Sequence, residues 1–270
     1  MDLVNWFLLL AFTALGGWLL GVRLGERGAA SARVGLFVGV AMLIAWTFLV
    51  RHQGVAVQII PVSVMSKLEG VGAVPWFMLV LGIAWARSTM RRQQIVIGWA
   101  MMLGAIFFVN GGRWMLQTTP TAVMGQSTAR MVVMQSQDYS CVPAASATML
   151  NLLRVPTTEA RMAELTHTRP GTGSTTLRAL DGLNQRLTNV GADFRAVLIE
   201  PGVDELRGVP LPAITPLQFE QGRRHMVTMT AFTRRGVAIH DPVEGAMLIG
   251  WDGFDRYFTG QVITHEPLDR

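Results

Sequence analysis

The feature that most constrains the fold of this chain is a series of four apolar segments in its first 110 residues. Each segment is 15 to 17 residues long and contains no Asp, Glu, Lys or Arg. A helix that crosses a bilayer needs about 20 apolar residues, and flanking Trp, Gln or Arg side chains can extend a shorter segment. We therefore predict an α-helical transmembrane region of about four helices over residues 1–110, with spans at Trp6–Val22, Val34–Val50, Val71–Ala86 and Ile95–Val109.

Other interpretations of the apolar segments are weaker. A soluble protein can bury an apolar helical bundle, but four charge-free segments in succession are unusual in that class. The first segment lacks the basic start of a secretory signal peptide, and no small-residue cleavage site follows it. A further apolar stretch at residues 55–65 is short and contains Pro61, so we expect an interfacial or loop segment there.

Positive charge is concentrated in the loops between the apolar segments. Residues 1–110 carry eight basic and three acidic residues, which accounts for the net charge of +5, whereas residues 111–270 carry fifteen of each. The two basic loops contain Arg23, Arg27 and Arg33, and Arg87, Arg91 and Arg92. By the positive-inside rule both loops are cytoplasmic, which places the N-terminus and, after four spans, the C-terminal domain outside. The charge thus indicates membrane topology and not a nucleic-acid-binding face.

After the last span the sequence pattern changes to that of a compact domain. We expect a polar linker at residues 111–130 and a folded domain at residues 131–270. The expected elements are a short strand at Met131–Met134, helices at Thr157–His167 and Ser174–Leu187 (ending at Gly191), and strands at FRAVLI, LPAITPL, HMVTMTAF, GVAIHDP and AMLIGW. Helices followed by strands predict an α+β domain with an antiparallel sheet.

The single cysteine of the chain, Cys141, lies at the start of an expected helix. In the stretch QSQDYSCVPAASATML, Pro143 follows two residues later, and proline is favoured in a first helical turn. The helix dipole and the free backbone N–H groups at this position favour the thiolate, which is the nucleophilic form of cysteine. A lone cysteine is often inert packing, so a catalytic role requires a nearby base.

We expect His225 and Asp241 to complete a catalytic triad with Cys141. His225 opens a strand, and the following TRRG is typical of a hairpin turn. The hairpin would bring Asp241, at the end of the next strand, beside His225, where its carboxylate can fix the imidazole tautomer. His240 is adjacent in sequence but should point to the opposite face of the strand.

Gln135, six residues before Cys141, could supply a donor for the oxyanion that forms when a carbonyl is attacked. Its side-chain amide would act together with a backbone N–H at the cysteine. Each of the four residues has an ordinary structural explanation by itself, and the indication of catalysis comes from their joint arrangement. Because the histidines are scattered and there is no second cysteine, we expect no metal and no cofactor.

These four residues and their spacing resemble the peptidase C39 family of papain-like cysteine peptidases. The segments DPVEG, LPAITPL, GTGSTTLRAL and FDRYFTG also resemble segments of that family. The resemblance covers about residues 131–265 and implies a papain-like α+β fold in which Cys141 is the nucleophile, His225 the base, Asp241 its orienting partner and Gln135 the oxyanion donor.

Two positions depart from the family pattern, which usually has Gly after the nucleophile and often Asp before it. Val142 and Ser140 stand at these positions, and the branched side chain of Val142 could either narrow the cleft or alter which residue fits next to the scissile bond. The best-known relatives are fused to ABC transporters and cut leader peptides after a Gly-Gly pair. This sequence has no Gly-x-x-x-x-Gly-Lys-Ser/Thr motif, so we expect neither an ATPase nor ATP binding.

The sequence thus predicts a multi-pass protein of the bacterial inner membrane, whose extracytoplasmic domain hydrolyses peptide bonds. The expected partners are the lipid bilayer and a peptide or protein substrate that has been exported or is membrane-anchored. Two alternatives stay open: a catalytically silent C39-like domain that binds a peptide for transport or assembly, and a thiol-dependent acyl transferase.

Overall fold

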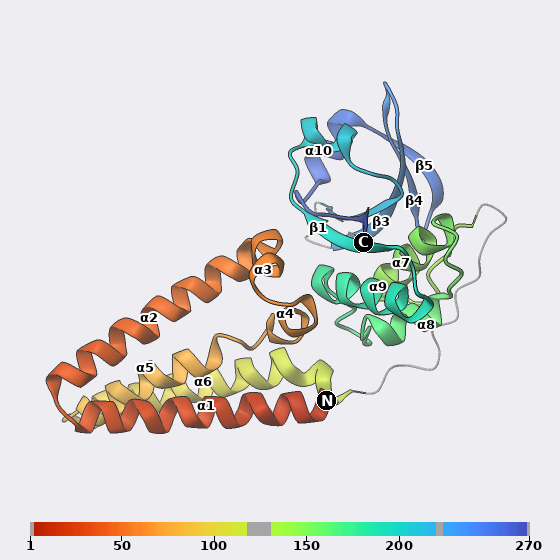
Figure 1. Ribbon diagram of the computed structural model, residues 1–270. Helices are drawn as coiled ribbons and strands as arrows, with labels where there is room; N and C mark the ends of the chain where they lie inside the picture. Colours follow the sequence, from red (N-terminus) through yellow and green to blue (C-terminus); the bar gives the residue numbers. More distant parts are fainter. Residues whose placement is uncertain (1–2, 118–130, 220–223, 269–270) are drawn as a thin grey trace. The chain divides into compact units, whose positions relative to one another are not determined.

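The computed structural model describes residues 3–117, 131–219 and 224–268. The chain forms two compact units, which divide between Gln117 and Thr118 (Figure 1). We call them the helical unit, described over residues 3–117, and the sheet unit, described from residue 131 onward.

The helical unit contains only helices and turns among its described residues. They are α1 (Leu3–Glu26), α2 (Ala29–Arg51), α3 (Gln53–Ile59), α4 (Val62–Leu68), α5 (Val74–Arg87) and α6 (Arg91–Leu116). Three of them, α1, α2 and α6, are long and apolar enough to cross a membrane. Helix α6 also continues to Leu116, so the first part of the expected linker is helical.

The expected third span is shorter than predicted. Helix α5 has 14 residues, which corresponds to roughly 21 Å at 1.5 Å per residue, less than the hydrocarbon thickness of a bilayer. The apolar run begins at Val71, but residues 71–73 form turns and Pro75 lies in the first helical turn of α5. The helical unit thus has three candidate spans and one shorter apolar helix, where we predicted about four spans of 15 to 17 residues.

Helices α1 and α5 pack side by side through a stripe of glycines. Gly17, Gly21 and Gly25 recur at every fourth position of α1, and a Cβ atom on Gly17 would lie 2.3 Å from the carbonyl oxygen of Pro75. Small residues at this spacing allow membrane helices to approach closely. A Cβ atom on Gly25 would lie 2.6 Å from the Cβ atom of Ala86. Because the contacts advance along both helices together, α1 and α5 run parallel.

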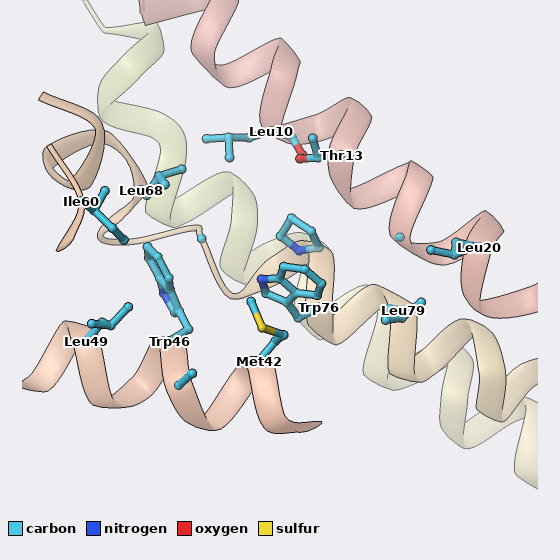
Figure 2. A pocket seen from close by; sticks show the side chains of 14 residues that line it. Leu10, Thr13, Leu20, Met42, Trp46, Leu49, Ile60, Leu68, Trp76 and Leu79 are labelled. Carbon is cyan, nitrogen blue, oxygen red and sulfur yellow. The ribbon is translucent and has the colours of Figure 1, made fainter. Parts of the chain in front are cut away.

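The apolar stretch at residues 55–65 forms parts of α3 and α4, which are separated at Pro61. The interruption at the proline agrees with the sequence, from which we expected an interfacial or loop segment. An apolar cavity of about 570 Å³ is lined by residues from α1, α2 and α5 and from the α3–α4 region. Trp46 of α2 and Trp76 of α5 both extend into this cavity (Figure 2).

The described part of the sheet unit begins with three helices, and a six-stranded sheet follows them, as expected for an α+β domain. The helices are α7 (Cys141–Leu152), α8 (Glu159–Leu165) and α9 (Thr176–Val190). The strands are β1 (Phe194–Ile199), β2 (Ala213–Gln218), β3 (Arg224–Phe232), β4 (Gly236–Asp241), β5 (Gly245–Gly250) and β6 (Val262–Pro267), in the order β1-β6-β2-β3-β4-β5. All neighbouring strands are antiparallel, which confirms the predicted sheet type.

Different elements cover the two faces of the sheet. On one face, the hydroxyl of Thr228 in β3 donates a hydrogen bond of 3.0 Å to the carbonyl of Ala145 in α7. On the other face, Val227 and Met229 join a buried cluster with Leu206 of a 3₁₀ helix (Val203–Gly208) and with Phe254 of α10 (Trp251–Tyr257). The sheet is thus fixed to α7 only a few residues from both Cys141 and His225.

Local predictions in the sheet unit have mixed outcomes. Helix α9 ends as expected at Gly191, which adopts the left-handed conformation with φ 67°. No strand forms at Met131–Met134, where only Val133 makes an isolated β-bridge, although Val132 and Val133 are both buried. Strand β6 and helix α10 were not predicted.

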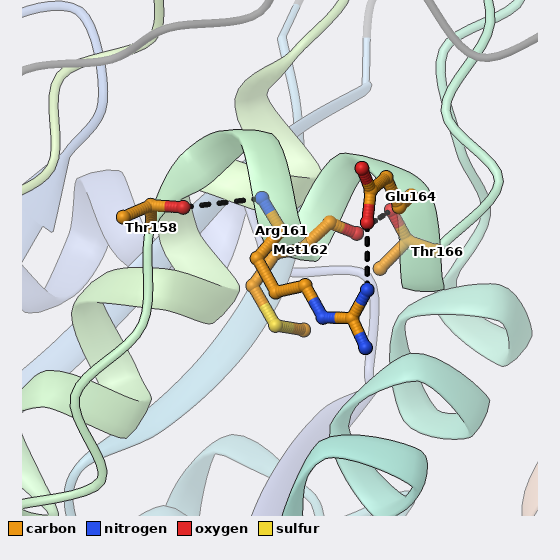
Figure 3. A network of polar contacts seen from close by, with 5 residues as sticks. All are labelled: Thr158, Arg161, Met162, Glu164 and Thr166. Atoms are coloured by element: carbon orange, nitrogen blue, oxygen red, sulfur yellow. Dashed lines mark hydrogen bonds and ion pairs between the residues drawn. The ribbon is translucent and has the colours of Figure 1, made fainter.

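Helix α8 is short and is held by local polar contacts (Figure 3). The hydroxyl of Thr158 accepts the backbone N–H of Arg161 at 3.2 Å and so caps the start of the helix. Arg161 forms an ion pair of 2.7 Å with Glu164, and the hydroxyl of Thr166 donates to the carbonyl of Met162 at 2.8 Å. The first helical residue after the cap is Glu159.

Candidate active site

Cys141 is the first residue of α7, as the position of Pro143 predicts. Residues 142–150 of this helix are buried, whereas Cys141 is partly exposed. The Val142 side chain is 5% exposed and is not among the residues that line the cavity over the cysteine. Val142 therefore does not form part of the wall of this cavity.

His225 and Asp241 lie side by side in the sheet unit. Strands β3 and β4 pair as an antiparallel hairpin, closed at Gly236 by a backbone hydrogen bond from Thr233 N–H of 2.8 Å. The Nε2 atom of His225 lies 2.9 Å from Oδ1 of Asp241. Their side chains are 17% and 8% exposed, respectively, so the pair is largely shielded from water. His240 does not line the cavity that holds this pair.

The imidazole of His225 interacts with both Asp241 and Cys141. Burial alone would lower its pKa, but hydrogen bonds to Asp241 and Cys141, together with the charges of both groups, outweigh burial and raise the pKa from 6.5 to about 9. Because Nε2 faces Asp241, Nδ1 is the ring nitrogen left for the cysteine sulfur. The geometry therefore supports an imidazolium at neutral pH.

Asp241 is fixed by more than its histidine partner. Its Oδ1 atom also accepts the backbone N–H groups of Val243 at 2.7 Å and Glu244 at 3.2 Å. Burial by itself raises the pKa of Asp241. The hydrogen bond to His225, the two backbone N–H groups and the charge of His225 together lower the pKa by more than burial raises it, so the net shift is downward. An ionised carboxylate is thus held in one orientation against the imidazole.

Gln135 lies at the same cavity, which has a volume of about 440 Å³. Its backbone N–H donates to the carbonyl of Pro242 at 2.9 Å, next to Asp241. Its side-chain oxygen Oε1 is buried and has no hydrogen-bond partner among the described residues. The structure therefore brings Cys141, His225, Asp241 and Gln135 to one cavity.

Sequence reasoning missed several other residues of this cavity. Asp138, Phe219, Arg224, Val243 and Glu244 also line it. All of them lie within a few residues of a predicted site residue or strand end, so their position in the sequence could have indicated that they line the cavity. Among the described residues there is no group of three or more His, Cys, Asp or Glu side chains that could hold a metal ion.

The raised pKa of His225 predicts the alkaline limit of any reaction that needs its imidazolium. The protonated form persists up to about pH 9 and is lost above it. The same shift stabilises the fold below the ordinary histidine pKa of 6.5, and this contribution disappears as the pH rises from 6.5 to about 9. We expect kcat/KM for peptide hydrolysis to fall above about pH 9, as His225 loses the proton that the departing amine requires.

Asp241→Asn is the matched variant for this pH profile. It keeps the side-chain size but removes the negative charge that raises the pKa of His225, so the alkaline limb should move to lower pH. If kcat/KM of the wild-type chain already fell near pH 6.5, or if the variant lost activity at the same alkaline pH as the wild type, the assigned ion pair would be contradicted.

A family model of the peptidase C39 family matches residues 129–270. An uncharacterised protein of Methanothermobacter thermautotrophicus is 35% identical over 141 residues, which cover 52% of this chain and 91% of that protein. A probable microcin secretion/processing ATP-binding protein of Escherichia coli is 32% identical over 81 residues, which cover 30% of this chain and 11% of that protein.

Solved structures of low sequence identity also match the sheet unit. One is a double glycine motif protease from an AMS/PCAT transporter in complex with a leader peptide, with a TM-score of 0.43 and 23% identity over 56% of this chain and 100% of that chain. Another is the peptidase domain of the bifunctional ABC transporter ComA of Streptococcus, with a TM-score of 0.44 and 18% identity over 50% and 96%, respectively.

Proposed function

The chain belongs to the peptidase C39 family, and on this premise we propose that its sheet unit is a thiol endopeptidase. The observation that carries the proposal is the position of His225, which contacts Cys141 on one side and Asp241 on the other. A cysteine at a helix N-terminus with a base and an orienting carboxylate has the parts that nucleophilic catalysis requires.

The proposed reaction proceeds through a thioester. The Cys141 thiolate attacks the carbonyl carbon of the scissile bond, and the negative charge moves to the carbonyl oxygen, which accepts hydrogen bonds from the Gln135 amide and the Cys141 backbone N–H. When the C–N bond breaks, the His225 imidazolium gives its proton to the departing amine. Water then attacks the thioester, His225 takes a proton from that water, and the thiolate leaves. Asp241 keeps the imidazole oriented throughout.

Hydrolysis of a peptide mixture by the detergent-solubilised full chain tests this proposal, with the product ends identified by mass spectrometry. Each cleavage should create one new amino terminus and one new carboxyl terminus, and both should depend on Cys141. Peptides that are retained but uncut would contradict hydrolysis and indicate a binding domain. Ligated peptides would instead indicate an acyl transferase.

The proposed enzyme is anchored in a membrane by its helical unit, which contains three candidate spans. Because α1 and α5 run parallel, their C-terminal turns, which contain Arg23 and Arg87, lie at one end of the unit. Helix α6 returns to the other end, where Phe108 packs on Phe7 near the start of α1 with ring centroids 5.0 Å apart. The positive-inside rule then supports an extracytoplasmic sheet unit.

The unique thiol makes this sidedness measurable. A membrane-impermeant maleimide should label Cys141 in intact cells, or in spheroplasts where an outer membrane intervenes, and Cys141→Ser supplies the unlabelled control. If folded protein with a free thiol were labelled only after membrane disruption, the sheet unit would be cytoplasmic and the topology proposal would be wrong.

A further inference from the structure

A buried carboxyl group outside the proposed triad contacts the segment that carries Gln135. Glu159, the first residue of α8, is 0% exposed. Its Oε1 atom accepts the backbone N–H of Ser136 at 3.0 Å. Its Oε2 atom is also buried and has no hydrogen-bond partner among the described residues. A fully buried carboxyl group is costly unless it makes a defined interaction. The Ser136 contact is the only hydrogen bond of this side chain within the described part of the chain.

The backbone that bears Glu159 is fixed to the helix of the proposed nucleophile. The side-chain oxygen of Asn151, near the end of α7, accepts the N–H of Thr157 at 2.9 Å. The next residue, Thr158, caps α8 through the N–H of Arg161 (Figure 3). Glu159 is therefore placed by α7, the same helix that begins with Cys141.

The segment from Gln135 to Ser140 is held at several points. The N–H of Gln135 donates to Pro242, and the Ser140 hydroxyl accepts the N–H of Gln137 at 3.1 Å and donates to its carbonyl at 2.9 Å. The Gln135 side chain itself makes no hydrogen bond to a described residue. The position of the Gln135 side chain at the cavity therefore depends on the backbone around it. Pro242 holds this backbone at Gln135 itself, and Glu159 holds it one residue later, at Ser136.

We propose that Glu159 is a positioning residue for the oxyanion site, acting through the Ser136 N–H on the placement of the Gln135 amide. The inference rests on the proposed function, since it concerns the same site. A donor must lie within a fraction of an ångström of its place to stabilise a developing oxyanion, so loss of the Ser136 contact should weaken catalysis without removing a reacting group.

The expected effect is on kcat more than on KM. Glu159→Ala removes the acceptor, and displacement of a catalytic group by about 1 Å can cost about 100-fold in rate, so we expect kcat to fall by about 10- to 100-fold. Glu159→Gln keeps an acceptor oxygen for Ser136 and should restore kcat to within about threefold of wild type. Glu164→Gln, on the exposed side of the same helix, is the matched control and should leave kcat unchanged.

A double-mutant cycle with Gln135 tests the inference. If Glu159 acts through Gln135, Glu159→Ala should cost little further kcat in a Gln135→Ala background, because the donor that it positions is already absent. The fraction of active sites, titrated by alkylation of Cys141, corrects each variant for unfolded protein. Equal fold-losses in both backgrounds after this correction would overturn the inference, since a merely structural role reduces both equally. Absence of Cys141-dependent hydrolysis in the wild-type chain would overturn the proposed function itself, and the inference with it.

Discussion

Replacement of Cys141 with alanine should abolish peptide hydrolysis, with a loss of at least about four orders of magnitude in kcat/KM. The sulfur is the only nucleophile at the N-terminus of α7 that contacts His225 in the described structure, and alanine cannot form a thioester. The loss should appear in kcat, because the remaining residues of the cavity can still bind substrate.

The fold should survive this change. Cys141 is partly exposed, and the helix that it begins is held by the buried residues that follow it. Thermal unfolding and membrane insertion of the variant should therefore match those of the wild-type chain. Cys141→Ser, which keeps a hydroxyl in the same place, should also be inactive, because serine is a much weaker nucleophile without a tuned base. Hydrolysis retained by either purified variant would contradict the proposed function.

Gln135→Ala should lower kcat by about 100- to 1,000-fold, as expected for loss of one oxyanion donor, with a smaller change in KM. Gln135 lines the cavity with Cys141, and its amide makes no competing hydrogen bond among the described residues. Steady-state kinetics of the variant on a single cleavable peptide would measure both constants.

Gln137→Ala is the matched control for Gln135. Gln137 lines a neighbouring hollow but not the cavity of Cys141, and its backbone contacts with Ser140 do not require its side chain. Its loss should change kcat by less than about threefold. If Gln135→Ala raised KM alone, Gln135 would bind substrate and would not stabilise the oxyanion.

The sequence indicates that His225 and Asp241 lie near each other, because a short hairpin joins their strands. The pairing shifts register between Met229 and Ala231, however, so the turn alone does not set which residues of β3 lie opposite Asp241. Alternation along β4 separates His240 from Asp241. The spacing of Gln135 and Cys141 could likewise be read from the sequence, but the cavity that unites the four residues depends on how α7 packs on the sheet.

Features that depend on tertiary contacts were not predictable. The contact of Glu159 with Ser136 joins residues 23 positions apart through the placement of α7 and α8. Residues 131–134 looked like a strand because they are apolar, yet only Val132 and Val133 of the four are buried, and the Val133 N–H donates to the Thr148 hydroxyl of α7 at 3.0 Å. A short apolar segment indicates that its residues are buried, but it does not by itself distinguish a strand from a buried irregular segment.

The sequence contains residues that indicate the late start of helix α5, although a hydropathy profile does not take them into account. The third apolar run includes Gly72 and Pro75, which favour a turn and a helix start, and Gly70 precedes it. The segment is apolar throughout, but its backbone changes from turns at residues 71–73 to a helix at Val74. The glycine stripe on α1 allows α5 to pack closely against it, so that Leu79, Gly82 and Ile83 of α5 are buried.

The most direct test of the central claim is the intact mass of the full chain during turnover. Rapid acid quenching of a reaction with excess peptide should reveal a fraction of the chain that is heavier by one acyl fragment of the substrate. Fragmentation should place that fragment on Cys141 as a hydroxylamine-sensitive thioester. Hydrolysis at the full rate with no acyl group on Cys141 under any quench time, or an acyl group on another residue, would contradict the account.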